Sequence, residues 1–409
     1  MLKADLSGVI VIIKMGLSKK QQEFVTLAET GSNIFLTGKA GSGKTFIVKQ
    51  LMARLNELNK KVIAIAPTGI AANNIGGQTI HSLFSINPHG ITSFDTCAFL
   101  RGEKRRMLKA INVIFIDEIS MLRPDILDGI NWTLLKNGCG SLKDKQIIFI
   151  GDLKQLPSPI NDNTKSVLYQ TYDGENFFNA KCYNELNVID IELDEVLRQS
   201  NEEFINNLNI IREGGRSEYF KQFVSIEPKG IILAPHNATV AKYNKDGLDK
   251  LDTFPKTFEA IVHGNIKAED FNLETFLTLK PGCKIMYLVN STNGSLVNGT
   301  LGTYIQKQTE GELLDFIQVK GVDYKIDIVE FTKKEYVLNE QTNTLELTEL
   351  GKIKQIPIKL AYALSIHKSQ GLTFEEVTVD LTRPCFAQGQ MYVALSRVTG
   401  PEGLRIIIK

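Results

Sequence analysis

A glycine-rich stretch over residues 38–45, GKAGSGKT, is the part of the sequence whose residue types most directly specify chemistry. Its spacing fits the phosphate-binding pattern G-x-x-x-x-G-K-[ST] in full. Glycine has no Cβ, so the loop can turn several backbone N–H groups toward one phosphate. Lys44 can reach the β- and γ-phosphates, and the Thr45 hydroxyl can bind Mg²⁺. The predicted ATP-binding residues of this loop are Gly38, Ala40, Gly41, Ser42, Gly43, Lys44 and Thr45.

Two adjacent carboxylates form a second candidate group. Asp117 and Glu118 directly follow the apolar run VIFI. A carboxylate at a strand end beside a phosphate loop can hold Mg²⁺, directly or through water. Its neighbour can orient or deprotonate an attacking water molecule. The alternative is an ordinary acidic strand end.

Three further polar residues could act on a transferring phosphoryl group. Gln155 follows Gly151-Asp152, and its amide could contact both water and a γ-phosphate. A surface turn before Pro157 explains it equally well. Arg198 and Arg397 could stabilise the charge on the phosphoryl group, although most arginines in any chain are solvated. Arginines from a second domain would couple hydrolysis to domain closure.

Strands and helices alternate around these residues. A short apolar strand leads into the glycine-rich loop, and a helical pattern follows from Lys44. Ser18 is a plausible N-cap for another helix over residues 17–30. Buried strands followed by polar residues recur within 60–75, 111–120 and 145–157. This alternation predicts a parallel sheet covered by helices, with ligands beyond the carboxyl ends of its strands.

The second half of the chain repeats this pattern and then interrupts it. Residues 229–244 predict a strand, a turn and a helix, and 378–398 predict a strand followed by a helix. Short segments between 283 and 357 are rich in β-formers, which predicts a small antiparallel barrel, with 343–357 loop-like. The expected domains are a first one over 1–189, a second over 190–282 and 358–409, and the inserted barrel over 283–357.

Composition limits the class of protein. A chain of 409 residues suggests two to three domains, and its net charge of +1 neither predicts nor excludes nucleic-acid binding. Five scattered cysteines without a C-x-x-C pair argue against a zinc site or disulfide framework. The apolar run Val9–Ile13 is too short for a membrane span and lacks a cleavage site, and Met15 is an alternative start. We expect a cytoplasmic or nucleoid protein with no membrane partner, compatible with a phage or viral origin.

Nine ordered segments together resemble the superfamily 1 helicases, in the petite-integration-frequency branch with its relatives of the RecD and Dda type. They cover most of residues 17–405, and the combination of GGQTIHSLF, HKSQGLTF and YVALSRV carries the resemblance beyond the phosphate motifs. The resemblance implies an α/β fold with two RecA-like domains, ATP in the cleft between them and single-stranded DNA across their top. The segments are LSKKQQ, FLTGKAGSGKT, APTGIAANNIGGQTIHSLF, IDEISML, GDLKQLP, LDEVLRQS, LVNGTLGTY, LAYALSIHKSQGLTFEEVTVDL and YVALSRV.

The same resemblance implies roles for individual residues around ATP. Gln21 resembles the glutamine that reads adenine. Asp117 resembles the metal-linked acid, and Glu118 resembles the catalytic base. Lys44 and Thr45 resemble the phosphate and Mg²⁺ residues, Gln155 the γ-phosphate sensor, Arg198 and Arg397 the arginine fingers, and Gln370 and Gly371 the loop that links ATP to DNA.

The resemblance also implies a DNA-binding set and a small wedge element over 82–107. Each DNA assignment has a structural alternative: the histidines could be buried, Thr68 could cap a helix, and Lys368 could be a solvated charge. Phe84, Phe94 and Phe99 could stack on a base or split a duplex, or belong to the core. The DNA-binding set is Pro67, Thr68, Thr79 and His81 in the first domain, and His367, Lys368 and Thr373 in the second.

We therefore expect an ATP-dependent DNA helicase. As the resemblance implies, it would move 5′-to-3′ on single-stranded DNA, unwind forked duplexes as a monomer with Mg-ATP, and serve replication, recombination or repair. One alternative is an ATP-gated switch that binds nucleic acid without separating strands. Another is an RNA-directed ATPase, since backbone grip and base stacking need not exclude RNA. Strand separation supports the first, binding without turnover the second, and stronger stimulation by RNA the third.

Overall fold

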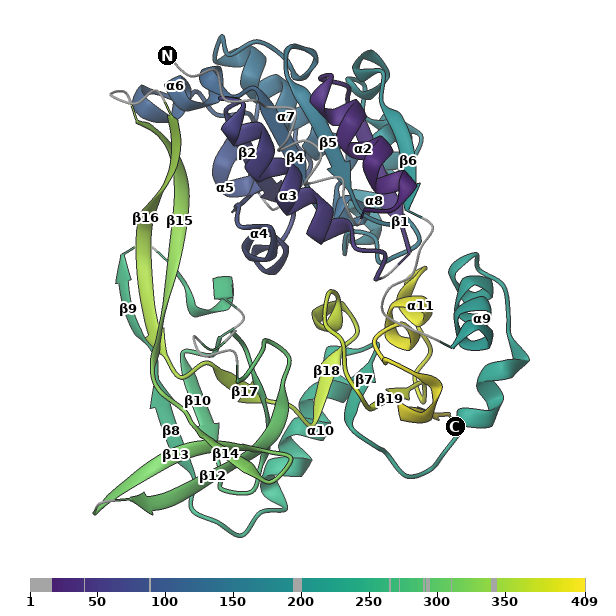
Figure 1. Cartoon of the computed structure of the whole chain (residues 1–409), viewed down its shortest axis with the longest axis vertical. Helices are drawn as coiled ribbons and strands as arrows, with labels where there is room; N and C mark the ends of the chain where they lie inside the picture. The colour runs from purple at the N-terminus through teal and green to yellow at the C-terminus, as the bar shows by residue number, and fades with distance from the viewer. Residues whose placement is uncertain are drawn as a thin grey trace. The chain divides into compact units, whose positions relative to one another are not determined.

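The computed structural model divides the chain into two compact units, which are described separately below (Figure 1). The first comprises the described residues of Met1–Leu153, Pro157–Arg198 and Lys334–Thr348, and the second those of Lys154–Leu156, Gln199–Lys333 and Glu349–Lys409. The expected N-terminal strand and the alternative start lie outside the described residues. The residues described are 17–39, 41–87, 90–193, 201–264, 266–271, 273–289, 291, 295–309, 311–339 and 344–408.

A six-stranded parallel sheet forms the centre of the first unit, in the order β3-β2-β4-β5-β1-β6. Every neighbouring pair is parallel, which confirms the predicted sheet. Parallel sheets are buried on both faces, and the apolar runs that enter these strands provide that burial. The strands are β1 (Ile34–Gly38), β2 (Val62–Ala66), β3 (Gln78–Thr79), β4 (Val113–Ile116), β5 (Gln146–Ile150) and β6 (Ile189–Leu193).

Successive residues of these strands contribute to two apolar clusters in turn. Ile34 and Leu36 belong to one cluster, whereas Phe35 belongs to the other. This alternation follows from the two-residue period of a strand. Helices α2 (Lys19–Glu29) and α3 (Lys44–Glu57) contribute to the first cluster, and α7 (Pro124–Lys136) to the second. The remaining helices of the unit are α4 (Gly69–Ile75), α5 (Ile80–Phe84), α6 (Gly102–Ala110) and α8 (Asp162–Tyr172).

The second unit contains a four-stranded parallel sheet in the order β18-β7-β19-β20. Its strands and two of its helices share one apolar cluster, in which Leu156 is fully buried. The strands are β7 (Ile231–Ala234), β18 (Ala363–Ser365), β19 (Val377–Asp380) and β20 (Leu404–Ile407). The helices are α9 (Glu202–Arg212), α10 (Asn237–Asp249) and α11 (Gln390–Leu395).

Antiparallel sheets make up the rest of the second unit, as the β-rich pattern predicted. A five-stranded sheet has the order β14-β13-β12-β11-β17. Its strands are β11 (Lys284–Tyr287), β12 (Leu301–Thr309), β13 (Glu312–Val319), β14 (Val322–Lys325) and β17 (Ile358–Leu360). A separate two-stranded sheet consists of β8 (Lys256–Glu259) and β10 (Phe276–Leu279). Asp315 on β13 links the two sheets, because its carboxylate accepts from Tyr304 on β12 at 2.6 Å and from Lys256 on β8 at 2.7 Å.

The expectation of a loop over 343–357 is wrong. Most of that stretch forms β16 (Thr344–Gln355), which lies between β15 (Val329–Asn339) and β9 (Ile261–Gly264) in a three-stranded sheet (Figure 1). Ile353 of β16 pairs with Val262 and is fully buried. Gly351, Ile353 and Gln355 of β16 are buried whereas Lys354 between them is exposed, and the partner strand β9 lies far earlier in the sequence. Among the helices that the structure describes, none is both long and apolar enough to cross a membrane.

Candidate functional site

The glycine-rich loop connects β1 to α3, and its backbone explains its glycines. Gly43 precedes α3 with φ 81° and ψ 13°, a left-handed conformation that side chains disfavour. At Gly38 a Cβ would lie 2.7 Å from the Leu193 carbonyl oxygen, which is closer than packing allows. The loop can therefore turn backbone N–H groups toward a phosphate, and the N-terminus of α3 adds a partial positive charge that attracts it. Ala40 lies outside the described residues.

Lys44 folds back over this loop. Its ammonium donates to the carbonyl oxygens of Gly38 at 2.6 Å and Lys39 at 3.0 Å. These contacts hold the charge at the loop and leave it half-buried. Thr45 is exposed in the first turn of α3. Lys44 is therefore positioned to exchange carbonyl partners for phosphate oxygens without leaving the loop.

Asp117 and Glu118 lie at the carboxyl end of β4. The Asp117 amide donates to Ile65 of β2 at 2.9 Å, and its carboxylate accepts from the Glu118 amide at 2.9 Å. Burial raises the pKa of Asp117 to about 6, against the lowering effects of the Glu118 amide and the charges of Lys44 and Lys49. Asp117 keeps some exposed surface, and a desolvated carboxylate that is costly to ionise suits a neighbouring cation.

Glu118 has a positive φ of 52° with ψ 48°, in the left-handed region that non-glycine residues seldom adopt. This conformation breaks the strand and starts the short 3₁₀ turn η1 (Ile119–Met121). Such backbone strain concentrates at functional sites. Among the described residues, no group of three or more His, Cys, Asp or Glu side chains could hold a metal ion. Mg²⁺ commonly takes few protein ligands and completes its shell with phosphate and water, so the predicted pair of Thr45 and Asp117 stays a prediction.

Gln21 occupies a buried position in the first turn of α2. The Gln21 side-chain oxygen accepts from the backbone amide of Ser18 at 3.1 Å, and the backbone amide of Gln21 donates to the Ser18 hydroxyl at 3.3 Å. These reciprocal bonds form a capping box. The Ser18 cap predicted from the sequence is confirmed, and the spacing S-x-x-Q would also have revealed the box. The structure thus gives Gln21 a local helix-capping contact.

Gln155 lies in the second unit, together with Leu156. The Gln370 side-chain amide donates to the Gln155 side-chain oxygen at 3.2 Å. Gly371 follows with φ 80°, and it precedes the exposed Thr373. The predicted phosphate sensor and the predicted loop that links ATP to DNA are therefore in direct contact, a relation that sequence spacing did not reveal.

Arg397 is fully buried in the second unit, with 1% of its surface exposed. Its guanidinium donates to the Val393 carbonyl at 2.8 Å, the Leu372 carbonyl at 3.3 Å and the Ser396 hydroxyl at 2.7 Å. The alternative of a solvated helix arginine is therefore wrong. Arg198 lies outside the described residues.

The predicted DNA-binding residues of the first unit follow strands β2 and β3. Thr68 caps α4 by accepting from the Ala71 amide at 3.3 Å, and Thr79 caps α5 by accepting from Ser82 at 3.4 Å. The capping alternative for Thr68 thus describes a contact that exists. Pro67 and His81 are half-buried beside them. All four retain some exposed surface, so none is confined to the core.

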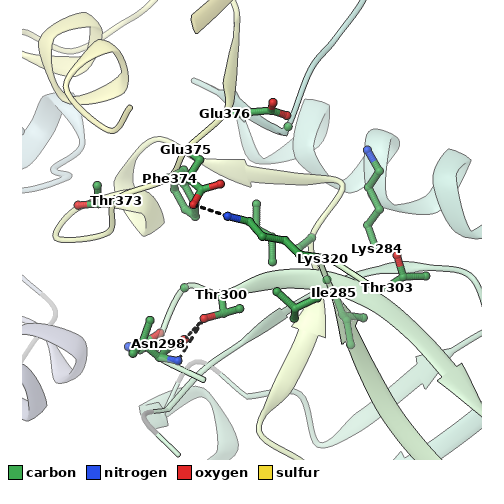
Figure 2. Close-up of a pocket in the computed structure, with 17 residues that line it drawn as sticks. Lys284, Ile285, Asn298, Thr300, Thr303, Lys320, Thr373, Phe374, Glu375 and Glu376 are labelled. Atoms are coloured by element: carbon green, nitrogen blue, oxygen red, sulfur yellow. Dashed lines mark hydrogen bonds and ion pairs between the residues drawn. The ribbon is translucent and has the colours of Figure 1, made fainter. Parts of the chain in front are cut away.

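The predicted DNA-binding residues of the second unit lie around the 3₁₀ turn η7 (His367–Ser369). Burial lowers the pKa of His367, which favours the neutral imidazole, whereas Lys368 is exposed. Figure 2 shows Thr373 at one side of a cavity of about 550 Å³, with Thr300 and Lys320 also on its lining. Glycines and apolar side chains form much of the remaining wall, which leaves Thr373 accessible.

The three phenylalanines of the expected wedge differ in environment. Phe84 is fully buried, which fits the core alternative, while Phe94 and Phe99 are 47% and 73% exposed. The Lys136 ammonium lies 5.3 Å from the Phe94 ring centre and 4.8 Å from the Phe99 ring centre. Such contacts stabilise an exposed ring. Phe94 and Phe99 are thus the candidates that remain accessible to a nucleic acid.

A buried ion pair that the sequence analysis missed holds the same segment. Arg123 and Asp125 are joined at 2.6 Å, and the Asp125 carboxylate also accepts from the Thr92 amide at 2.8 Å. Arg123 donates to the Gly90 carbonyl at 2.7 Å. These bonds fix the backbone just before the exposed phenylalanines. No motif signals the pair, because its partners on the segment are backbone groups.

Comparison with known proteins finds similarity to DNA helicases over nearly the whole chain. A sequence model of the family described as PIF1-like helicase matches residues 17–221. The ATP-dependent DNA helicase Pif1 of Campylobacter jejuni is 31% identical over 403 residues, covering 91% of this chain and 88% of the relative. The structure of Bacteroides sp Pif1 with ADP-AlF4 has a TM-score of 0.83 at 32% identity, covering 96% of this chain and 94% of that chain. The Bacteroides Pif1 complex with ADP-AlF3 and single-stranded DNA has a TM-score of 0.68 at 33% identity, covering 95% and 92%.

Proposed function

Because the chain belongs to the PIF1-like helicase family, we propose that it is an ATP-dependent DNA helicase that translocates 5′-to-3′ on single-stranded DNA. The observation that carries this proposal is the phosphate site of the first unit. There the Lys44 ammonium donates to the loop carbonyls, and its charge favours the ionised form of Asp117, which follows β4 of the same sheet. The Campylobacter jejuni relative at 31% identity is a DNA helicase by name, which directs the ATPase chemistry toward DNA.

The residues around the phosphate site divide the work of hydrolysis. Thr45 and Asp117 would hold Mg²⁺, which supplies charge neutralisation to the phosphates when bound. Lys44 stabilises negative charge on the β- and γ-phosphates. Glu118 accepts a proton from the attacking water, for which its position at the strand end suits it. Gln21 would contact adenine through its side-chain NH₂ group, which takes no part in the capping box.

Residues of the second unit would couple the phosphate site to DNA. Gln155 would contact the γ-phosphate when it is present. Its hydrogen bond with Gln370 would then couple the presence of that phosphate to the position of the loop that carries Thr373. Arg397 of the second unit would act as one arginine finger and Arg198, at the end of a first-unit segment, as the other. The proposed DNA track comprises Pro67, Thr68, Thr79 and His81 in the first unit, and His367, Lys368 and Thr373 in the second.

The proposed domain division is a first RecA-like domain over 1–189, a second RecA-like domain over 190–282 and 358–409, and a β-rich insertion over 283–357. The proposed substrates are single-stranded and forked DNA, the cofactors are ATP and Mg²⁺, and the active species is a monomer. A cytoplasmic or nucleoid place of action fits such substrates.

Unwinding of duplexes that carry either a 5′ or a 3′ single-stranded tail tests this function. We expect ATP-dependent strand separation with the 5′ tail and little with the 3′ tail. Glu118→Gln is the matched control, since it keeps the side-chain size but cannot accept the proton. Separation of the 3′-tailed duplex alone would contradict the polarity. ATP-gated binding without separation of either duplex would contradict the helicase proposal.

A further inference from the structure

Phe386 is an exposed aromatic residue with aromatic neighbours. Its side chain is 63% exposed, although it follows a strand of the second sheet by only a few residues. The His236 ring lies 5.1 Å from it between ring centres, and the His367 ring lies 6.0 Å from it with only 23° between the planes. Three segments distant in sequence thus place three rings together at the surface, which we call the aromatic ledge.

Buried hydrogen bonds hold the ledge in shape. The Phe386 amide donates to the Gln390 side-chain oxygen at 3.0 Å, and the Gln390 side-chain amide donates to the Pro235 carbonyl at 3.4 Å. Gln390 is fully buried in α11. The His236 Nε2 atom lies 3.2 Å from the Pro384 carbonyl oxygen. The loop that carries Phe386 is therefore tied at two points to the loop that carries His236.

The exposed Phe386 ring contributes little to the core. Large aromatic side chains are normally buried, whereas this one is exposed on a backbone that hydrogen bonds hold in place. Because the backbone is already held, little of its conformational freedom is lost when the ring binds a flat ligand. Polar and cationic residues adjoin the ledge in sequence, since Lys368, Arg383 and Gln388 are exposed and lie within three residues of His367 or Phe386. This setting suits an anionic ligand with flat rings better than an apolar protein partner.

We propose that the aromatic ledge of Phe386, His236 and His367 is a stacking platform for a base of single-stranded DNA. A base stacks on an aromatic face with little dependence on its identity, so the platform would grip DNA without selecting sequence. Lys368 and Arg383 would neutralise the adjoining phosphates. The inference rests on the proposed helicase function, and it adds Phe386 and His236 to the proposed DNA track.

Binding of a fluorescent oligothymidylate, followed by anisotropy without nucleotide, tests the platform. Phe386→Ala is expected to weaken binding roughly 5- to 150-fold, the loss of one stacked base. Phe386→Tyr should bind nearly as tightly as the unchanged protein, because the ring face remains. Phe386→Leu should bind poorly, because it keeps apolar volume without a π-face. Phe254→Ala is the matched control, since Phe254 is 92% exposed and lies outside the ledge.

An oligonucleotide with abasic sites throughout separates stacking from a general disturbance of the loop. Phe386→Ala should bind this probe as the unchanged protein does, because no base is left to stack. An equal loss with both probes, or full affinity of Phe386→Ala or Phe386→Leu for oligothymidylate, would overturn the platform. Thermal melting of each variant establishes that it is folded. If only the platform proposal is wrong, the unchanged protein still unwinds the 5′-tailed duplex. If the helicase proposal is wrong, the unchanged protein unwinds neither tailed duplex.

Discussion

The buried guanidinium of Arg397 allows one substitution to test a structural and a catalytic role together. In Arg397→Ala, the Leu372 carbonyl and the Ser396 hydroxyl lose the guanidinium as donor, while the Val393 carbonyl keeps the Ser396 hydroxyl at 3.0 Å. Hydrogen bonds from a charged group contribute about 1.5–3 kcal/mol each, and an unpaired buried acceptor is costly. The charge that no longer needs burial offsets part of this loss. We expect the free energy of unfolding of the second unit to fall by on the order of 2–5 kcal/mol.

The same substitution should loosen the loop that carries Thr373. Arg397 holds the Leu372 carbonyl through its guanidinium, and its own carbonyl accepts from the Phe374 amide at 2.9 Å. The substitution removes the side-chain tie to Leu372 and keeps the backbone tie to Phe374. If Arg397 is also an arginine finger, turnover at a temperature where the variant is folded should fall about a thousandfold or more. Single-stranded DNA should then no longer accelerate turnover.

Urea denaturation and steady-state ATPase measurements, with and without single-stranded DNA, give the two readouts. Arg397→Lys keeps the charge but lacks the planar fork, so it should restore only part of the stability. Arg216→Ala removes an exposed arginine of the same unit and should change the unfolding free energy by at most about 0.5 kcal/mol. Unchanged stability of Arg397→Ala would refute the buried network as a stabilising feature. Full DNA stimulation in that variant would refute the finger assignment.

Three other substitutions follow from the structure. Lys44→Ala should abolish ATP turnover while the fold stays intact, because no neutral side chain replaces the charge at the phosphates; near-normal DNA-stimulated ATPase activity would contradict this. Glu118→Gln should bind a fluorescent ATP analogue normally and lose hydrolysis, whereas collapsed affinity with persistent turnover at saturating ATP would assign Glu118 a structural or metal role. Lys359 on β17 has only 7% of its surface exposed. Burial, together with the nearby Lys368 charge, lowers the pKa of Lys359 from 10.5 to about 7. Between pH 7 and 10.5 the unfolded chain therefore binds more protons than the folded chain. The stability that Lys359→Met gains over the unchanged protein should be largest below pH 7 and should shrink above pH 7 by at most about 1.4 kcal/mol per pH unit. A pH-independent difference in urea denaturation would show that Lys359 keeps an ordinary pKa.

Local patterns in the sequence were sufficient for the elements that bind phosphate. The apolar run before Gly38 and the helical pattern after Gly43 correspond to β1 and α3, because strand and helix periodicity depend on neighbouring residues. The Ser18 cap and the strand-turn-helix unit of β7 and α10 follow for the same reason. Lys44, Asp117 and Glu118 could be named because carboxyl ends of parallel strands meet at one edge of a sheet.

Only the tertiary structure decided which side chains are buried and which distant residues meet. The three phenylalanines within 82–107 look alike in sequence, yet Phe84 lies in the core while Phe94 and Phe99 flank Lys136. The strand β16 needed its partner β9, and the aromatic ledge needed three separate segments. Burial and pairing over such separations depend on how the sheets pack, and that packing sums many weak contacts that no short window of sequence contains.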